Sequence, residues 1–183
     1  KLKKFNKKLH KKLKIVKDGE DIEIETFIDA EWAGDKETRL SISGYVILFN
    51  GSLISWRSKA QQIVTLLSSE SEYILLSDAV RDIKYCMMMC ESIGLKVRKP
   101  MIVRIDNVGA MFMAETANAT KRSRHIDVKY HHVRQEIEEG TIKLVFVKSE
   151  DNLADIFTKN VSKATLNVHG PKMIKERTNH FFD

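Results

Sequence analysis

The sequence predicts an α/β fold with a mixed five-stranded sheet, in which three antiparallel strands precede two strands that alternate with flanking helices. Residues 21–29 alternate strictly at first between polar and apolar side chains and place Ile22, Ile24 and Ile28 on one face, which is typical of a strand. Asn50-Gly51 lies between two further strand-like runs and is a strong hairpin signal. Residues 68–93 repeat apolar side chains every three or four positions, as a long packed helix does.

The composition is that of a folded protein. The 183 residues are 43% hydrophobic and 31% charged, which a globular chain has and a disordered chain lacks. We predict a linker or connection segment at residues 1–20, one domain at residues 21–160 and a C-terminal extension at residues 161–183. No apolar run approaches the ~20 residues that span a bilayer, so no membrane partner is expected. The sequence begins with Lys1, and we expect a processed product or a piece of a longer protein.

Positive charge is concentrated in an N-terminal arm. Residues 1–17 contain nine Lys and no acidic residue, whereas the whole chain has a net charge of +6, so the remainder is net negative. Apolar residues recur in this arm at the spacing of an amphipathic helix: Leu2, Phe5, Leu9, Leu13 and Val16. Such an arm could bind nucleic acid or a membrane surface. The favoured interpretation is a helix that docks its apolar stripe and leaves its lysines in water.

The first half of the predicted domain is an antiparallel meander followed by the long helix. The first strand ends on Asp29, and residues 30–39 form a loop. Residues 44–49 and 52–57 are the two strands of the hairpin. The first strand therefore delivers a carboxylate at its C-terminal end.

Two glutamates near the start of the long helix have different expected positions. Glu72 lies four residues before Leu76 on the apolar stripe, whereas Glu70 lines up with Arg81 on the polar face and is expected to face water. A competing interpretation places Glu72 in a capping box with Ser69, because Ser-x-x-Glu is that motif. A carboxylate that caps a helix is less free to bind a metal, so the two roles compete.

The two cysteines, Cys86 and Cys90, lie one turn apart on the same helix. Parallel side chains at this spacing have poor disulfide geometry. Too few further ligands accompany them for a zinc site. We predict buried free thiols in a reducing compartment.

The second half alternates strands and helices. A β-branched run ends on Asp106, and Gly140 is a typical residue just past a helix end. The predicted elements are a strand at 102–105, a helix at 107–116, a basic loop at 121–125, a helix at 126–139, a strand at 141–147 and a helix that begins at 151 or 152.

Four acidic residues stand at the ends of these elements: Asp29 and Asp106 after strands, Glu72 and Asp155 on first helical turns. If the first and fourth strands are neighbours, the four carboxylates meet at the edge where α/β sheets bind ligands. Like charges so close need a cation, and oxygen ligands alone favour Mg²⁺, which Mn²⁺ can replace. Two such ions can stabilise the attacking and leaving oxygens of a phosphodiester. The alternative is a chance cluster of surface acids.

Seven short motifs follow one another over about residues 22–160: FIDAEWAGD at 27–35, SGYV at 43–46, ISWRSK at 54–59, LSSESEY at 67–73, IDN at 105–107, HID at 125–127 and DNLADIFTK at 151–159. As an ordered set they resemble the ribonuclease H domain of copia-type LTR retrotransposon Pol polyproteins. Residues 1–20 resemble the end of the segment that joins reverse transcriptase to that domain. Past Lys159 the family's proline-containing stretch and Leu-rich helix are not recognisable.

The resemblance implies a ribonuclease H-like fold that hydrolyses the RNA strand of an RNA/DNA hybrid during reverse transcription. It implies two Mg²⁺ ions and makes four acids both catalytic and metal-binding: Asp29, Glu72, Asp106 and Asp155. The Ser-Glu-Tyr motif matches Glu72, the same residue that the helical phase favours. The implied partners are the hybrid and the reverse transcriptase domain of the same polyprotein. The implied location is the cytoplasm within virus-like particles, or the nucleus.

The basic loop and its neighbours are the candidates for hybrid contacts, because a hybrid offers two phosphate backbones: Lys121, Arg122, Arg124, His125 and Asn107. His131 and His132 could act as acid and base, although packing on the sheet is favoured. Trp32 and Trp56 are expected to be core or sheet-packing residues rather than platforms for base stacking.

Two other functions remain open. One is a catalytically inactive or domesticated domain that binds nucleic acid or a protein, or serves a structural role. The other is an integrase-type strand transferase, whose last acid would lie at Glu138 or Glu139.

Overall fold

The computed structural model describes residues 21–34, 37–62, 64–65, 67–115 and 124–174, and of residues 124–130 only the backbone. The predicted linker, residues 1–20, lies outside these ranges, as do Lys121 and Arg122. No helix in the described part of the chain is both long enough and apolar enough to cross a bilayer.

The sheet has the predicted five strands in the order β3-β2-β1-β4-β5. β1 pairs antiparallel with β2, β2 pairs antiparallel with β3, and the pairs β1–β4 and β4–β5 are parallel. The strands are β1 (Ile24–Glu31), β2 (Ile42–Phe49), β3 (Ser52–Ala60), β4 (Met101–Ile105) and β5 (Ile142–Phe146). The predicted fold class is confirmed.

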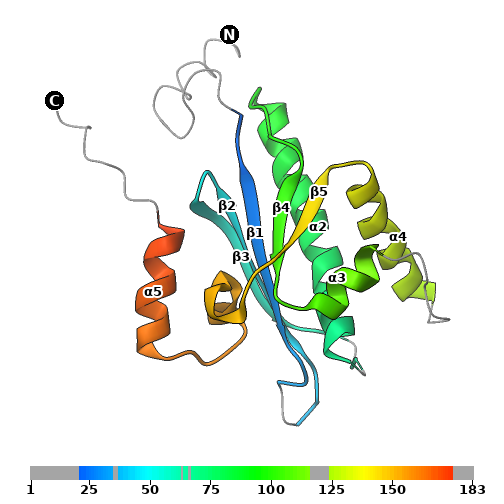
Figure 1. Ribbon diagram of the computed structural model, residues 1–183, viewed down its shortest axis with the longest axis vertical. Coiled ribbons are helices and arrows are strands. Elements are labelled where there is room, and N and C mark those ends of the chain that lie inside the picture. The colour runs from blue at the N-terminus through cyan, green and yellow to red at the C-terminus, as the bar shows by residue number, and fades with distance from the viewer. Residues whose placement is uncertain (1–20, 35–36, 63, 66, 116–123, 175–183) are drawn as a thin grey trace.

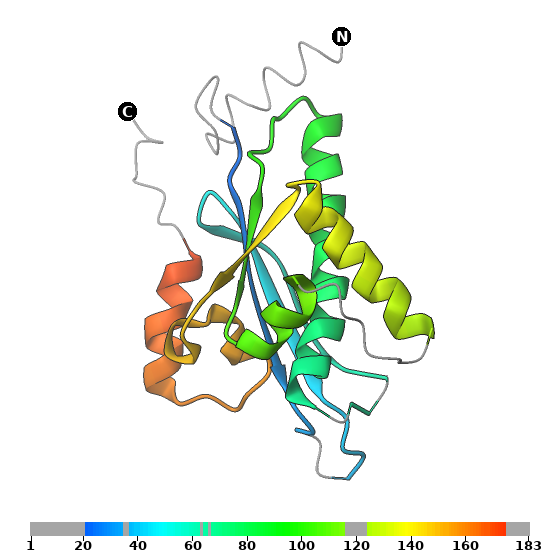
Figure 2. The same ribbon diagram turned by 45° about the vertical axis from the view of Figure 1, so that its right-hand side comes forward.

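Helices cover both faces of this sheet (Figures 1 and 2). One face carries α2 (Ser68–Ser92), α3 (Val108–Glu115) and α4 (Arg124–Glu138). The other carries the 3₁₀ helices η1 (Ser149–Asp151) and η2 (Leu153–Phe157) and the helix α5 (Lys163–Met173). The helix predicted from residue 151 or 152 is therefore two short 3₁₀ segments. α5 has no counterpart among the predicted elements, and its buried Met173 packs with Leu153 of η2 in one apolar cluster.

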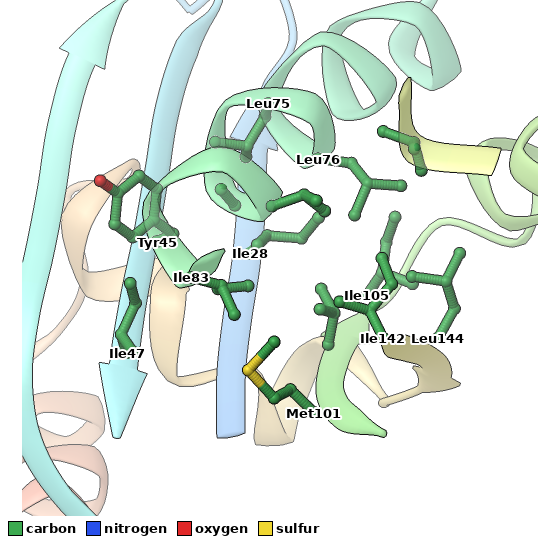
Figure 3. Close-up of a cluster of buried hydrophobic side chains, with 14 of the residues drawn as sticks. Ile28, Tyr45, Ile47, Leu75, Leu76, Ile83, Met101, Ile105, Ile142 and Leu144 are labelled. Atoms are coloured by element: carbon green, nitrogen blue, oxygen red, sulfur yellow. The ribbon is translucent and has the colours of Figure 1, made fainter. Parts of the chain in front are cut away.

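The alternation along β1 divides the core. Ile24 and Ile28 pack against α2 in the larger cluster, and Figure 3 shows Ile28, Leu76 and Ile105 converging there from the sheet and α2. Phe27 points to the opposite face, into the smaller cluster with Leu153 and Met173. Asp29, two residues after Phe27, therefore points toward the η2 side.

Three residues with positive φ confirm predicted chain reversals. Asn50 (φ 48°) and Gly51 (φ 79°) form the turn between β2 and β3, as an Asn-Gly hairpin requires. Gly140 (φ 67°) follows α4 as a C′ residue, in the left-handed conformation that glycine adopts without steric cost.

Candidate active site

The parallel pairing of β1 and β4 explains how two carboxylates meet. Phe27 lies opposite Arg104 in the ladder. Asp29 and Asp106 each follow two residues later on their strands, so both reach the same edge of the sheet. Glu72 comes from the first turns of α2, and one carboxylate oxygen each of Asp29, Glu72 and Asp106 lies within 4.8 Å of the others. The structure thus brings together three of the four predicted acids.

Glu72 is fixed by the backbone of β1. Its Oε1 accepts a hydrogen bond of 2.8 Å from the Ala30 amide. Its Oε2 is buried and has no hydrogen-bond partner among the described residues. One oxygen therefore orients the side chain, while the other remains available to a ligand.

Glu70 has the capping role that was considered for Glu72. The Leu67 amide donates to Glu70 Oε2 at 3.3 Å, so Glu70 rather than Glu72 reaches back to the start of α2. Glu70 is only 7% exposed, so the expectation that it faces water was wrong. Helical phase placed it on the polar face, but a side chain folded back over the first turn is covered by that turn.

Asp29 is buried, at 3% exposure, beneath the segment that follows η2. The Thr158 hydroxyl donates to its Oδ2, and Lys159 Nζ lies 3.0 Å from its Oδ1. This approach depends on Gly44, the residue opposite Asp29 in β2. A Cβ on Gly44 would lie 2.6 Å from Thr158 Cγ2, which is closer than van der Waals contact allows.

Asp155 lies apart from the three clustered acids and is linked to them through Lys159. Lys159 Nζ is 2.8 Å from Asp155 Oδ1 and 3.0 Å from Asp29 Oδ1, so one ammonium bridges the two carboxylates. The fully buried Asn152 holds η2 in place. Its amide nitrogen donates to the Ile28 carbonyl at 2.8 Å, and its oxygen accepts from the Ala154 amide.

Asp106 is the most accessible acid of the cluster. The Ser149 hydroxyl of η1 donates to its Oδ2 at 2.5 Å. The next residue, Asn107, caps α3, since its Oδ1 accepts from the Ala110 amide at 3.0 Å. This cap does not use the side-chain NH₂ group of Asn107, which can donate to nucleic acid.

The buried carboxylates resist ionisation. Burial raises the pKa of Glu72 well above its usual value, and the charges of Asp29 and Asp106 add to this, although the hydrogen bond from Ala30 opposes it. Burial also raises the pKa of Asp29, despite the opposing contacts with Thr158 and Lys159. Burial lowers the pKa of Lys159, but its contacts with Asp155 and Asp29 outweigh this and the net pKa is raised.

This cluster fits a hard divalent cation. Its ligand atoms are carboxylate oxygens, the type that Mg²⁺ and Mn²⁺ prefer. A bound cation would be a partner for Glu72 Oε2, which has none in the described part of the chain, and would offset the charge that burial disfavours.

The residues predicted to contact nucleic acid are only partly described. Arg124 and His125 lie in the first turn of α4, but their side chains are outside the described residues, as are Lys121 and Arg122. Within the same helix His131 is exposed, and His132 Nδ1 lies 3.9 Å from Glu136. Their substrate contacts stay predictions.

Some residues of the site had no assigned role in the sequence. Thr158, Lys159 and Ser149 contact the acids directly, and Asn152 was expected only as a possible first residue of a helix. The DNLADIFTK motif was the one available signal for the first two. Neither tryptophan is buried: Trp56 is 61% exposed and Trp32 is 45% exposed, so neither is a core residue.

Comparison with known proteins extends these observations. No protein-family model matches the sequence. The chain is 31% identical over 148 residues to the retrovirus-related Pol polyprotein from transposon RE1 of Arabidopsis thaliana, and 32% identical over 145 residues to that from transposon TNT 1-94 of Nicotiana tabacum. These matches cover 81% and 79% of the chain, which spans about a tenth of the relatives' length.

The fold also matches a solved structure. LC11-RNase H1, in its crystal structure in complex with an RNA/DNA hybrid, superposes with a TM-score of 0.51 at 18% identity. The match covers 80% of this chain and 99% of that one, so it shows the fold over nearly all of the solved domain. The chain therefore belongs with the copia-type retrotransposon Pol polyproteins, as a segment that has the ribonuclease H-like fold.

Proposed function

We propose that this chain is an Mg²⁺-dependent endoribonuclease that hydrolyses the RNA strand of RNA/DNA hybrids during retrotransposon reverse transcription. The observation that carries the proposal is the carboxylate cluster of Asp29, Glu72 and Asp106 at the carboxyl edge of β1 and β4. The homology to Pol polyproteins and the ribonuclease H-like fold support a nuclease. The hybrid in the LC11-RNase H1 crystal supports the choice of substrate.

The four acids would divide the metal-binding work. Asp29, Glu72 and Asp106 would hold one Mg²⁺, and Asp29 together with Asp155 would hold a second. When bound, these ions would activate water and neutralise charge on the departing oxygen. The residues of the chain position these ligands: Ala30 orients Glu72, and Asn152 anchors η2 and hence Asp155.

Substrate and protein partners follow from the same proposal. The hybrid would be held by the basic segment around Arg124 and by Asn107, with 2′-hydroxyl contacts separating RNA from DNA. The reverse transcriptase domain of the same polyprotein would be the protein partner. The reaction would take place in cytoplasmic virus-like particles or in the nucleus.

The integrase-type alternative receives no support from the placement of its candidate acids. Glu138 and Glu139 lie at the end of α4, just before β5. Because β5 runs parallel to β4 and Met101 pairs with Ile142, this end of α4 lies at the start of β4. Asp106 follows the other end of that strand. The non-catalytic alternative is addressed by the experiment below.

The deciding experiment is cleavage of an end-labelled RNA/DNA hybrid in Mg²⁺, comparing the wild-type chain with Asp106→Asn. We expect the wild type to cut the RNA strand and leave an RNA duplex intact, and we expect the substitution to reduce the rate at least about 100-fold. The variant should keep the circular dichroism spectrum of the wild type, because Asp106 lies at the surface edge of the sheet.

The possible results separate the alternatives. Equal cleavage by both proteins would refute the site. Hybrid binding without cleavage would favour the non-catalytic domain. Joining of DNA strands in a parallel assay would favour the integrase type.

A further inference from the structure

Lys159 places a positive charge inside the proposed metal centre. Its Nζ lies 2.8 Å from Asp155 Oδ1 and 3.0 Å from Asp29 Oδ1. Asp29 is almost fully buried, whereas the Lys159 side chain is 37% exposed. The ammonium thus stands at the mouth of the cluster, between its buried acid and its outlying acid.

This ammonium contacts the two residues that the proposed function assigns to the second Mg²⁺. A cation bound between Asp29 and Asp155 would use oxygens that Lys159 already contacts. A divalent ion and an ammonium at that spacing from the same oxygens would also repel each other. The ligands proposed for the first Mg²⁺ include an oxygen that no such contact occupies, because Glu72 Oε2 has no partner among the described residues.

We propose that Lys159 is a built-in cation that occupies the second-metal position until a divalent ion displaces it. In the metal-free protein it holds Asp155 to Asp29 and offsets the repulsion between them. Occupation of that position by a divalent ion requires the ammonium to swing outward. The inference rests on the proposed function, since it assumes a metal centre formed by these acids.

The side chain can make this movement. Lys159 follows η2 by two residues, so its backbone is held near Asp155 by the bond from its own amide to the Asp155 carbonyl, at 2.9 Å. Its four-carbon stem has several rotatable bonds and is partly in water. Displacement therefore moves a side chain and not the segment that carries Asp155. Lys159 is in this sense a positioning residue that sets the metal concentration at which the second ion binds.

The test is a calorimetric Mn²⁺ titration of the full chain in four forms: wild type, Lys159→Met, Lys159→Gln and Lys143→Met. Lys143 is an exposed lysine of β5, so its replacement removes the same charge away from the site. We expect the wild type to bind one ion more tightly than a second. Removal of the Lys159 charge should strengthen the weaker step about tenfold, change the tighter step less than about twofold, and leave Lys143→Met like the wild type.

Thermal unfolding in EDTA tests the role of Lys159 in the metal-free protein. Lys159→Met should unfold at a lower temperature than Lys143→Met, because it leaves Asp29 buried without its cation. Saturating Mn²⁺ should remove this difference. Lys159→Gln retains a hydrogen-bond donor without the charge, so it separates the loss of charge from the loss of packing.

The outcomes distinguish the two proposals. If wild type and both Lys159 variants bind two ions with equal affinities, Lys159 does not occupy the second position and the inference is wrong while the metal centre stands. If every one of the four proteins binds a single ion, the inference about Lys159 is also wrong, and the metal centre again stands. If no form binds Mn²⁺, the metal centre itself is refuted, and the inference with it.

Discussion

Glu70 and Glu72 show how two identical residues acquire different roles from their hydrogen bonds. Both are buried on the first turns of α2. Glu70 accepts from the Leu67 amide and stabilises the start of the helix. Glu72 accepts from Ala30 of β1 and keeps one oxygen without a partner in the described part of the chain. Only Glu72 lies within reach of Asp29 and Asp106.

The first prediction compares the two glutamates in the hybrid-cleavage assay. Glu72→Gln should reduce Mg²⁺-dependent cleavage at least about 100-fold, because it removes the carboxylate of a proposed metal ligand. Glu70→Gln should retain most activity, because the amide oxygen can still accept from Leu67, and it should cost at most about 1 kcal/mol of unfolding free energy. A larger loss of cleavage in Glu70→Gln would show that the site has been assigned to the wrong glutamate.

Residue-level prediction from sequence succeeded where position along an element decides the outcome. Asp29 lies near the C-terminal end of β1, which continues to Glu31 instead of ending at Asp29 as predicted, and Asp106 directly follows β4. The two strands are parallel neighbours, so the meeting of these carboxylates follows from the strand pattern. It failed where a side chain's conformation decides, as for the buried Glu70 and the exposed Trp56. Lys159 also had no role predicted from the sequence. Its distance along the sequence from Asp29 does not predict that the two side chains are in contact.

The contact between η2 and β2 is the element-scale feature that shapes the site. Phe157 and Thr158 pass so close to β2 that only a residue without a side chain fits at Gly44. The approach places the Thr158 hydroxyl and Lys159 on Asp29. The packing of an element end against a strand thus controls the surroundings of a proposed metal ligand.

The second prediction is that Gly44→Ala damages the site more than the fold. The added methyl would lie 2.6 Å from Thr158 Cγ2, so the segment after η2 must shift outward. We expect a destabilisation of about 1–3 kcal/mol from overpacking, measured by urea unfolding, and a clear loss of hybrid cleavage. Gly170→Ala is the matched control, because nothing lies within 4 Å of its added methyl. Full cleavage by Gly44→Ala would contradict the tight approach.

A second element-scale feature joins α2 to α4. Glu136 of α4 is 2% exposed and pairs with Lys84 of α2. His132 Nδ1 lies 3.9 Å from the same carboxylate oxygen. An ion pair with a buried partner is sensitive to the loss of one member, because the remaining charge is left without compensation.

The third prediction concerns this pair. Lys84→Met should lower the unfolding free energy by about 2–4 kcal/mol, whereas Lys84→Met combined with Glu136→Met should recover part of the loss. Urea unfolding of the wild type, both single variants and the double variant measures the coupling. Additive effects of the two substitutions would show that the two side chains do not stabilise each other.

At the scale of elements, prediction from the sequence succeeded where a short motif strongly favours one backbone conformation. The Asn-Gly turn and Gly140 end their elements as expected. The 3₁₀ geometry of η2 and the presence of α5 were not predicted. η2 owes its position to the distant bond between Asn152 and the Ile28 carbonyl. α5 has weak amphipathic character, and its burial of Met173 depends on a surface that exists only after folding.

At the scale of the whole molecule, the sheet order concentrates acidic groups at one edge. β1 and β4 are neighbours in the sheet, and helices cover its two faces (Figure 1). Glu72 belongs to α2 on one face, and Asp155 belongs to η2 on the other. The full strand order β3-β2-β1-β4-β5 was not predicted from the sequence. It was assumed only that the first and fourth strands are neighbours, which the structure confirms. This arrangement brings like charges together in a buried cluster. The carboxylates are therefore unfavourable unless they are protonated or bound to a cation.

The pH dependence of stability follows from the raised pKa values of Glu72 and Asp29. In the unfolded chain Glu72 would release its proton near pH 4.5, whereas the folded, metal-free chain holds that proton to a higher pH. Between these two pKa values the folded state binds more protons than the unfolded state. The unfolding free energy therefore falls as pH rises through this interval. A bound divalent cation would replace the proton and remove this loss of stability.

The fourth prediction is that, in EDTA, the wild type loses more stability than Glu72→Gln when the pH is raised from about 5 to about 8. Comparing the two proteins cancels the contributions of all the groups that they share. Urea unfolding at several pH values measures the difference, and saturating Mg²⁺ should raise the wild-type curve most at the alkaline end. Parallel curves for the two proteins in EDTA would mean that Glu72 ionises in the folded protein as it does in water, and that its surroundings do not call for a cation.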